Sequence, residues 1–480
     1  MTYLSVILVY LFALIAIGIV KSRKIHTQSD FALAGRTLTP WVLVGTMLAS
    51  WIGTGSILGN AGKTYETGMA ALMLPIGSIL GIILLTRIAG KVRSYEKYTV
   101  PEIIGDRYGP VARNLSVFAL VMAYMVIVSY QYNAGGAVLY TILADNTGTS
   151  IISIELATII AAVFIIAYTM LAGLLSVAYT DAANSIIMTL ALIISLPILW
   201  IKAGSWSGME TAFAAMNKSQ HMQFGGVYSA MDIINFCLPP FLLVIGDANM
   251  YQRFSASKDV QSARYSTTIL VFAVLFIELL IIVSAWVSSS MIPEAEVGKH
   301  VLIYAAHQFL PTFLGAIMLT TIVGIIISTA DSFLLVPANT LIRDIYLNYI
   351  NPQASEKNIV RLSRLLVLLL GIIAYIVSIG FSRSAGFFER ALYAYTIYGA
   401  AITPALVAAL FWRGATKEGA VASIICGTLI TLFWKELPGL WFWLPTKWYI
   451  SLDEVLPAIS GSLLALIGVS YLTQKADPGK

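Results

Sequence analysis

The stretch MLASWIGTGSILGNAG, residues 47 to 62, decides the fold. It belongs to an apolar run long enough to cross a membrane, yet it contains Gly53, Gly55, Gly59 and Gly62. Glycine weakens a helix and leaves backbone groups that lipid cannot hydrogen-bond, so a break here survives only where it lines a cavity. The alternative is close packing of an unbroken transmembrane helix, which glycine at every third or fourth position also favours.

A second apolar run contains similar residues. The stretch NFCLPPFLLVIGDANMYQRF, residues 235 to 254, has two prolines followed by Gly246, Asp247 and Asn249. Four uninterrupted runs separate the two stretches, so five runs begin with each break, in opposite membrane orientations. In transporters built from inverted repeats, such broken helices meet at the bilayer centre and bind substrate and ions. The break positions therefore predict a five-plus-five inverted repeat.

The composition indicates an integral membrane protein of the all-α class. Of the 480 residues, 58% are hydrophobic and 11% are charged. A run of about 20 apolar residues spans the hydrocarbon core, which is about 30 Å thick. We expect about thirteen transmembrane helices, centred on residues 3–20, 41–62, 69–90, 115–141, 152–172, 178–201, 229–250, 266–290, 309–342, 363–381, 389–412, 418–434 and 454–473.

These runs divide the chain into four regions. Residues 1–40 form an additional N-terminal transmembrane helix with a cytoplasmic loop, and residues 41–203 form the first repeat of five helices. Residues 229–413 form the second repeat, and residues 414–480 hold two C-terminal helices and a short tail. The longest non-apolar segment is the loop at about 202–228, so we expect no appended soluble domain.

The basic residues predict the orientation in the membrane. The first apolar run has no basic residue before it, and Lys21, Arg23 and Lys24 follow it, which is typical of an uncleaved anchor with its N-terminus outside. In this topology twenty of the 29 basic residues lie inside and eight outside. We expect a multi-pass protein of the plasma or inner membrane with a cytoplasmic C-terminus. The formal charge of +5 then reflects orientation rather than nucleic-acid binding.

Several functional classes lack support in the sequence. Cys237 and Cys426 lie in apolar runs, so we expect no disulfide. The four histidines have no metal-ligand spacing, and no nucleophile with an adjacent base is visible, which argues against a metalloenzyme or an intramembrane enzyme. Nothing indicates an obligate protein partner, so the expected surroundings are lipid and a small solute.

One carboxylate lies deep in an apolar run. In ISTADSFLLVPANTLIRDIY, residues 327 to 346, Asp331 is the only charged residue between Gly315 and Ile342. Helical spacing places Ser328, Asp331 and Ser332 on one face and Thr329 about 100° around it. A carboxylate at the bilayer centre costs at least about 2.5 to 3.5 kcal/mol, so it usually faces water, a partner or an ion. The alternative is a cap in which Asp331 bonds its own hydroxyl neighbours.

A second acid, Asp181, follows Thr180 in LAGLLSVAYTDAANSIIM, residues 171 to 188. It is a candidate for ion binding, and the alternative is an N-cap at the start of the sixth run. Both roles are compatible. Hydroxyls, carboxylates and backbone carbonyls are hard oxygen ligands that suit Na⁺.

Six motifs in order give a resemblance to a known family. They are DFALAGRTLTPW (30–41), ASWIGTGSILGNAGKTYETG (49–68), KYTVPEIIGDRYG (97–109), LAGLLSVAYTD (171–181), YQRFSASKD (251–259) and ISTADSFLL (327–335). The chain resembles the sodium/solute symporters, which include transporters of proline, sugars, sialic acid and choline. The resemblance implies the leucine-transporter type of five-plus-five inverted repeat with flanking helices.

The resemblance also implies a site for Na⁺. In the family, two backbone carbonyls of the broken first core helix, with a carbonyl and two hydroxyls of the eighth, bind the ion. Some relatives hold a second sodium nearer the cytoplasm, on positions that here are Asp181, Asp331 and Ser332, with aspartate at 331 where some relatives have serine. The residues that match the first site are Ala49, Ile52, Ile325, Ser328 and Thr329.

For the substrate site, the sequence predicts candidate residues but leaves the chemical class of the solute open. Asp247 matches a position that lines the pocket in sugar and choline relatives, and Trp51, Thr54, Gln131 and Asn249 are further candidates. An aspartate beside a tryptophan suits an amine or quaternary ammonium, but it also suits sugar hydroxyls or an anchor for the broken helix. We therefore expect a symporter that couples Na⁺ entry to uptake of a small polar organic solute. The alternative is a membrane-embedded solute sensor that does not transport.

Overall fold

The structure is a computed structural model of the chain. It describes residues 2–22, 25–144, 150–294, 298, 300–381, 386–434 and 452–474. Residues 475–480 of the expected C-terminal tail lie outside these ranges. Eight of the counted basic residues also lie outside them: Arg23, Lys24, Lys299, Arg383, Lys435, Lys447, Lys475 and Lys480.

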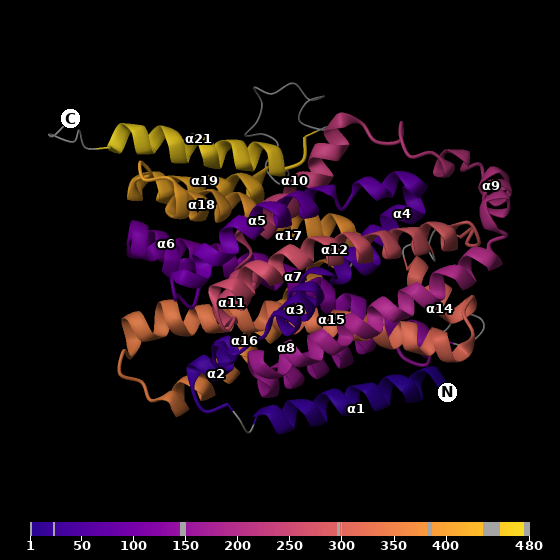
Figure 1. The fold of residues 1–480 in the computed structure, drawn as a ribbon, viewed down its shortest axis with the longest axis horizontal. Helices are drawn as coiled ribbons and strands as arrows, with labels where there is room; N and C mark the ends of the chain where they lie inside the picture. Colours follow the sequence, from indigo (N-terminus) through magenta and orange to yellow (C-terminus); the bar gives the residue numbers. More distant parts are fainter. Residues whose placement is uncertain are drawn as a thin grey trace.

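The described residues are organised as helices, as the apolar runs predict (Figure 1). The first half contains α1 (Thr2–Ser22), α2 (Gln28–Leu33), η1 (Ala34–Arg36), α3 (Pro40–Trp51), η2 (Gly55–Asn60), α4 (Ala61–Thr67), η3 (Gly68–Met73), α5 (Ile76–Ser94), α6 (Val100–Tyr108), α7 (Pro110–Ile142), α8 (Ile154–Lys202), α9 (Ser205–Ala215) and η4 (Ser219–Met222). The second half contains α10 (Ala230–Gly246), α11 (Ala248–Ala256), α12 (Val260–Ser289), α14 (Val301–Gln308), α15 (Thr312–Thr340), η5 (Leu341–Ile350), α16 (Glu356–Phe381), α17 (Phe387–Ala401), α18 (Thr403–Phe411), α19 (Lys417–Phe433) and α21 (Val455–Thr473).

Polar residues fix where several helices begin. Thr27 and Asp30 form a capping box at the start of α2, and Ser229 and Asp232 form another at the start of α10. The Asp259 carboxylate accepts a hydrogen bond from the backbone N–H of Ser262 at 2.6 Å and caps α12. These side chains satisfy backbone amides that have no partner inside the helix. The starts of α2, α10 and α12 are thereby defined.

Many of the helices are suited to a membrane. Within the described residues, eight helices are long and apolar enough to cross it, and the bent pair formed by α3 with η2–η3 raises this to nine. The expected fifth and sixth runs are joined in the single element α8, which kinks at Gly173, where φ is +59°. Glycine tolerates this left-handed backbone without the steric cost that other residues have. The chain is therefore a multi-pass membrane protein by the length and apolarity of its helices.

Both glycine-containing stretches are interrupted. The helix α3 ends at Trp51, and the segment from Gly55 onward is bent from it by 51°. In the second stretch, α10 ends at Gly246 and α11 begins at Ala248, so the break lies at Asp247. Pro239 and Pro240, which we expected to contribute to this break, instead lie inside continuous α10.

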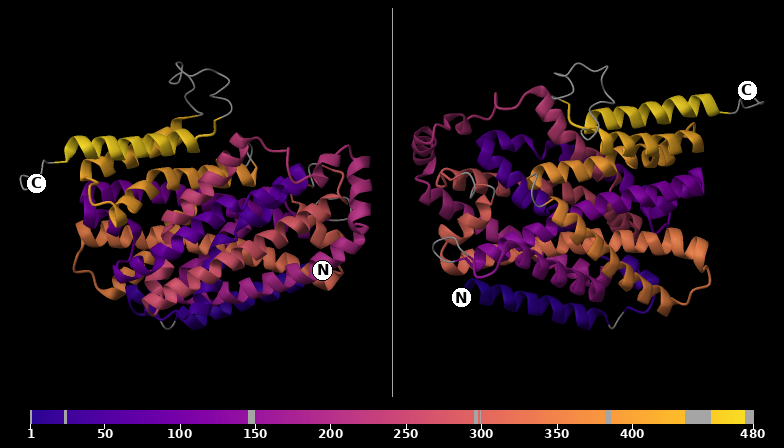
Figure 2. Two further views of the ribbon diagram at one scale, coloured as in Figure 1. Left: turned by 45° about the horizontal axis from the view of Figure 1, so that its top comes forward. Right: turned by 180° about the vertical axis from the view of Figure 1, so that it is seen from behind.

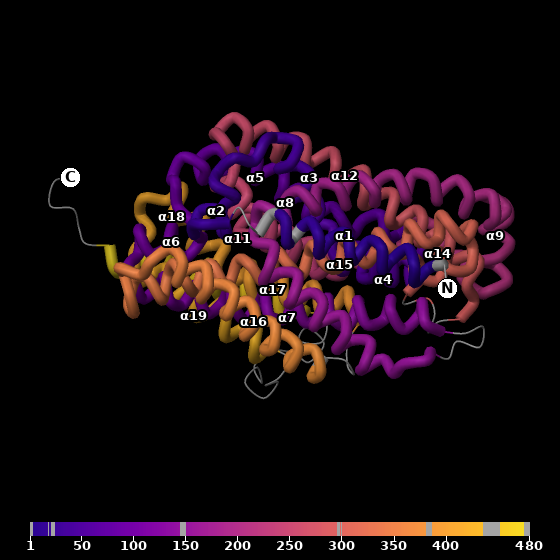
Figure 3. The backbone as a smooth tube through the Cα atoms, turned by 90° about the horizontal axis from the view of Figure 1, so that it is seen from below, coloured from indigo at the N-terminus to yellow at the C-terminus, as the bar shows by residue number. Residues whose placement is uncertain are grey.

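The broken helices lie at the centre of the bundle. The helix α3 packs on α8, α8 packs on α15, and α11 contacts both α3 and α15. Figures 1 and 2 show α1 on one flank of these helices and α19 with α21 on the opposite flank. The tube in Figure 3 shows that α1 begins at one end of the long axis and α21 ends toward the other.

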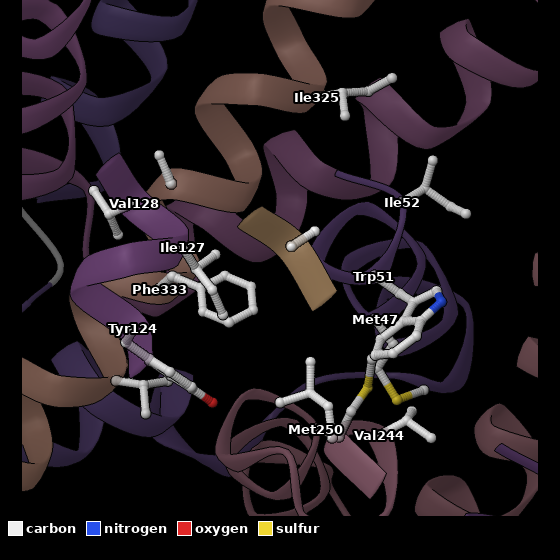
Figure 4. Close-up of a cluster of buried hydrophobic side chains, with 14 of the residues drawn as sticks. Met47, Trp51, Ile52, Tyr124, Ile127, Val128, Val244, Met250, Ile325 and Phe333 are labelled. Carbon is white, nitrogen blue, oxygen red and sulfur yellow. The ribbon is translucent and has the colours of Figure 1, made fainter. Parts of the chain in front are cut away.

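Apolar side chains fill the space around the two breaks. Tyr124 of α7 and Phe333 of α15 pack edge to face with ring centroids 4.6 Å apart. Figure 4 shows these rings facing Met47 and Trp51 of α3 and Met250 of α11. Such close packing holds the ends of the broken helices at fixed positions, so polar groups at the breaks are placed reproducibly.

Candidate functional site

The break after α3 frees a backbone carbonyl. In a continuous helix the N–H of Gly53 would bond the carbonyl of Ala49, but here it donates to the carbonyl of Trp51 at 2.9 Å. Ile52 takes the non-helical angles φ −76° and ψ 85° and is fully buried. The carbonyl of Ala49 is therefore available to a partner outside its own helix.

Two hydroxyls of α15 meet that carbonyl. Thr329 Oγ1 lies 3.3 Å from the oxygen of Ala49, and Ser328 Oγ lies 3.5 Å from it. Ser328 Oγ also lies 3.2 Å from the carbonyl oxygen of Ile325. Both hydroxyl side chains are buried. Four of the five residues that the resemblance implies for Na⁺ are thus in direct contact, and Ile52 lies at the break beside them. Hard oxygens gathered in this way are the ligand type that Na⁺ prefers.

The second predicted group is divided between two places. Asp181 lies inside α8 rather than at a helix start, so the N-cap alternative is wrong. Its Oδ2 accepts a hydrogen bond from Thr46 at 2.7 Å and lies 3.5 Å from Nη2 of Arg253, which also donates to Ser332 Oγ at 2.7 Å. Asp331 instead accepts a hydrogen bond from Thr169 of α8, not from a hydroxyl of its own helix.

Arg253 is a central residue, although it is one of the twenty basic residues that the charge count expects inside. It lies on α11 with its side chain fully buried. Besides Asp181 and Ser332, its Nε donates to Thr46 Oγ1 at 3.0 Å. The guanidinium therefore connects α3, α8, α11 and α15. The sequence signal that could have indicated its burial is its position close to a helix break, in the motif YQRF.

Asp247 occupies the second break. Its carboxylate accepts hydrogen bonds from the hydroxyl of Tyr124 at 2.5 Å and from the backbone N–H of Asn249 at 3.1 Å. The latter caps α11. The side-chain amide of Asn249, in contrast, is buried and has no partner within the described part of the chain. These contacts are those that an anchor for the broken helix would make.

The remaining predicted substrate residues surround the first break. Thr54 donates a hydrogen bond to Oε1 of Gln131, and Nε2 of Gln131 is buried without a partner among the described residues. Trp51 stacks on Tyr395 of α17 with ring centroids 6.3 Å apart. Among the described residues, no group of three or more acidic, histidine or cysteine side chains could hold a metal.

Glu278 is a further buried carboxylate that the sequence analysis did not single out. It lies in the middle of α12 and bonds Ser56 and Asn60 beyond the first break. The sequence signal for Glu278 is the same as for Asp331, because each is a lone acid in an apolar run.

A model of the sodium:solute symporter family matches residues 31–427, which is most of the chain. The chain belongs to the sodium:solute symporter family. Among curated relatives, the sodium/proline symporter of Haemophilus influenzae is 26% identical over 98% of this chain and 94% of its own length. The high-affinity proline transporter of Bacillus subtilis is 25% identical, with 96% of both chains covered.

Solved structures share the fold of this symporter family member. A Na⁺-coupled sialic acid symporter in a substrate-bound outward-open state matches with a TM-score of 0.81 at 15% identity over 99% of both chains. A nucleobase-cation-symport-1 family transporter matches with a TM-score of 0.58 at 12% identity, over 92% of this chain and 94% of its own. Family membership makes Na⁺-coupled transport across a membrane the class of activity, with Na⁺ as the coupling ion.

Proposed function

We propose that this symporter imports a small polar organic solute by alternating access, driven by inward flow of Na⁺. The observation that carries the proposal is the meeting of the Ala49 carbonyl with the Ser328 and Thr329 hydroxyls across the break in α3. Each Na⁺ that enters gains about 2.3 kcal/mol per 100 mV of membrane potential. That energy corresponds to about fifty-fold accumulation of solute per ion.

The primary Na⁺ site consists of Ala49, Ile52, Ile325, Ser328 and Thr329. In this assignment three carbonyls and two hydroxyls surround the ion, because Ile52 supplies a carbonyl that its non-helical backbone turns away from the helix axis. Na⁺ then links α3 to α15, so its arrival favours one arrangement of these helices. Coupling follows if the solute binds that arrangement better than the other.

Asp181, Asp331 and Ser332 belong to the release path rather than to a second resident Na⁺ site. Asp181 is already paired with Arg253, and that guanidinium also holds Ser332. A bound cation beside Asp181 would face the positive charge of Arg253 at short range. One oxygen of Asp181 and one of Asp331 have no partner within the described residues, which suits brief contact with a departing ion.

The solute binds around the first break. The unpartnered Nε2 of Gln131 and the unpartnered side-chain amide of Asn249 are available to hydrogen-bond it, and Trp51 with Thr54 contributes from the break itself. Asp247 anchors α11 through Tyr124 and the backbone of Asn249. The sodium/proline symporter among the relatives supports a solute of about the size and polarity of proline.

The topology comprises thirteen membrane crossings in a five-plus-five inverted repeat. In the described part of the chain, eight long apolar helices and the broken α3 pair account for nine crossings. The helices α1, α5 and α19, together with a division of α8 into two crossings at Gly173, bring the number to thirteen. An odd number of crossings agrees with α1 and α21 starting and ending at opposite ends of the bundle (Figure 3). The basic residues place the N-terminus outside and the C-terminus in the cytoplasm.

The test is a thermal-shift screen followed by uptake. Purified protein is heated with amines, amino acids, sugars or carboxylates, each in NaCl and in KCl of equal ionic strength. A solute at about 100 times its Kd stabilises the folded state by about 2.7 kcal/mol. We expect a solute that stabilises the protein in NaCl far more than in KCl and that accumulates in proteoliposomes under an inward Na⁺ gradient. Equal stabilisation in both salts, or binding without uptake, would contradict the proposal.

A further inference from the structure

A small cavity lies beside the first break, and none of the acids predicted from the sequence lines it. Its volume is about 30 Å³, enough for about two water molecules, so it must widen to admit a solute. Residues from the broken helix, α12 and α17 form much of its wall. They include Trp51, Ser56, Asn60, Glu278, Phe388 and Tyr395.

The cavity adjoins a much larger vestibule of about 730 Å³. Phe388 lines both spaces. Phe388 packs edge to face on Phe236 at a centroid distance of 5.3 Å, and Lys63 lies 5.8 Å from the Phe388 ring. The two spaces thus share Phe388 as a common wall residue.

Glu278 is the acid inside the cavity. Its side chain is buried, Oε1 accepts a hydrogen bond from Ser56 at 2.6 Å, and Oε2 accepts one from Asn60 at 3.0 Å. Both donors are neutral. Within the part of the chain that the structure describes, no lysine, arginine or histidine forms an ion pair with it.

An ionised carboxylate in such a place lacks a counter-charge. Burial of an unpaired charge is costly, and a cation at hydrogen-bonding distance offsets that cost. Asp181 has Arg253 for this purpose, whereas Asp247 has neutral donors, as Glu278 does, but does not line this cavity. Glu278 lines this cavity without an ion-pair partner in the described part of the chain, so the missing positive charge is best supplied by a ligand.

The aromatic residues around Glu278 suit the same ligand. Trp51 and Tyr395 are stacked with an interplanar angle of 27°, and both line the cavity. Faces of aromatic rings attract cations, and the attraction increases where water is excluded. A carboxylate bordered by aromatic side chains therefore recognises an ammonium group with N–H donors more readily than a neutral hydroxyl group.

We propose that the solute of this symporter carries a primary or secondary ammonium group, and that Glu278 binds that group in the cavity beside Trp51 and Tyr395. The inference rests on the proposed function, because it takes the cavity to be part of the solute path. It moves the acidic recognition residue from Asp247 on the second break to Glu278 on α12. Ser56 and Asn60 then act as positioning residues that orient the carboxylate.

The experiment uses matched pairs of probes that differ in the amine. They are glucosamine and glucose, proline and tetrahydrofuran-2-carboxylate, and ethanolamine and ethylene glycol, each measured by thermal shift with the full chain in NaCl and KCl. We expect at least one amine to bind and its amine-free partner to bind at least about tenfold more weakly. Binding of the amine-free members alone, or of no probe, would overturn the assignment of an ammonium-bearing solute.

Three variants then test the residue. Glu278→Gln should weaken the amine at least about tenfold, since it keeps the shape and removes the charge, and Glu278→Asp should retain part of the affinity. Glu418→Gln, an exposed residue at the start of α19, is the matched control and should leave the affinity unchanged. A cooperative thermal transition measured without solute verifies that each variant is folded.

The outcomes separate the two proposals. Amine affinity that is unchanged in Glu278→Gln would refute the role of Glu278. Amine binding that needs Glu278 but is equal in NaCl and KCl would leave the role of Glu278 intact and contradict Na⁺ coupling. If Glu278→Gln shows no cooperative thermal transition, it is misfolded and the Glu278→Asp variant decides. Loss of amine affinity in Glu278→Asp to the level of the amine-free partner would contradict recognition by charge.

Discussion

Gly53 lies directly against the side chain of Thr329. A Cβ atom at position 53 would stand 2.9 Å from both Oγ1 and Cγ2 of Thr329, which is closer than such atoms approach. Glycine at this position therefore allows the broken end of α3 to reach α15. The same threonine hydroxyl lies 3.3 Å from the carbonyl of Ala49, so the spacing of the proposed Na⁺ ligands depends on this contact.

Gly53→Ala should weaken Na⁺ binding at least about fivefold. The added methyl group must push Thr329 away or separate the helices, and overpacking of this kind typically costs about 1 to 3 kcal/mol. The measurement is the Na⁺ concentration that gives half-maximal thermal stabilisation. Gly225→Ala is the control, because a Cβ there would meet nothing within 4 Å. Equal Na⁺ dependence in Gly53→Ala and the wild type would show that this contact does not set the site.

The pair formed by Arg253 and Asp181 should behave as one unit. Arg253→Gln leaves a buried carboxylate without its cation, and loss of one partner of a buried pair costs about 3 to 5 kcal/mol. Adding Asp181→Asn removes the uncompensated charge, so the double variant should be more stable than Arg253→Gln alone. Thermal midpoints of the four proteins form a double-mutant cycle. If the losses of stability in the two single variants simply add up in the double variant, the ion pair does not contribute to stability, although its atoms are 3.5 Å apart.

Asp247→Asn should lower stability and leave the choice of solute unchanged. The carboxylate receives hydrogen bonds from Tyr124 and from the backbone of Asn249, and a hydrogen bond to a charged group contributes about 1.5 to 3 kcal/mol. Tyr124→Phe removes one of these bonds from the other side and should have a similar effect. The measurement is the thermal midpoint together with the ranking of solutes. A changed ranking with an unchanged midpoint would assign Asp247 to the solute site.

A histidine between α9 and α10 predicts a pH effect on stability. His221 is buried, and this burial, with the nearby charge of Lys218, lowers the pKa of its imidazole to about 4. The folded state thus disfavours the protonated ring. Stability should be complete above about pH 6.5, the pKa of an unfolded histidine, and should fall as the pH drops from there toward 4.

Thermal midpoints between pH 4 and 7.5 test this prediction. The variant His221→Gln should lose this part of the pH dependence, because glutamine does not titrate. His26→Gln, which changes an exposed histidine, is the matched control and should retain it. An identical pH profile in His221→Gln and the wild type would contradict the account.

The sequence predicted those features that follow from local chemistry. Lipid cannot satisfy free backbone groups, so the glycines after Trp51 predicted a helix break there, and α3 does end at Trp51. In the second stretch the prolines were a poor guide, because Pro239 and Pro240 lie within α10 and the helix ends only at Gly246. Neighbouring helices can satisfy the carbonyls that a proline releases, and sequence alone does not reveal those neighbours.

The sequence alone could not predict which buried polar and charged residues contact one another. Asp181, Arg253 and Ser332 are far apart along the chain and meet only when α8, α11 and α15 pack together. Arg253 follows the second break closely, so counting charges assigned it to the cytoplasmic side, although the folded bundle buries it. Glu278 was visible as a lone acid in an apolar run, but its cavity depends on the bend of α3.

Equilibrium binding of ²²Na⁺ to purified protein tests the central claim most directly. The comparison is between the wild type and the double variant Ser328→Ala/Thr329→Ala, which removes both hydroxyls near the Ala49 carbonyl and leaves the backbone in place. The backbone carbonyls alone would leave the ion under-coordinated, so we predict loss of saturable binding in a protein that remains folded. Unchanged Na⁺ affinity in the double variant would contradict the assignment of the Na⁺ site to the break in α3.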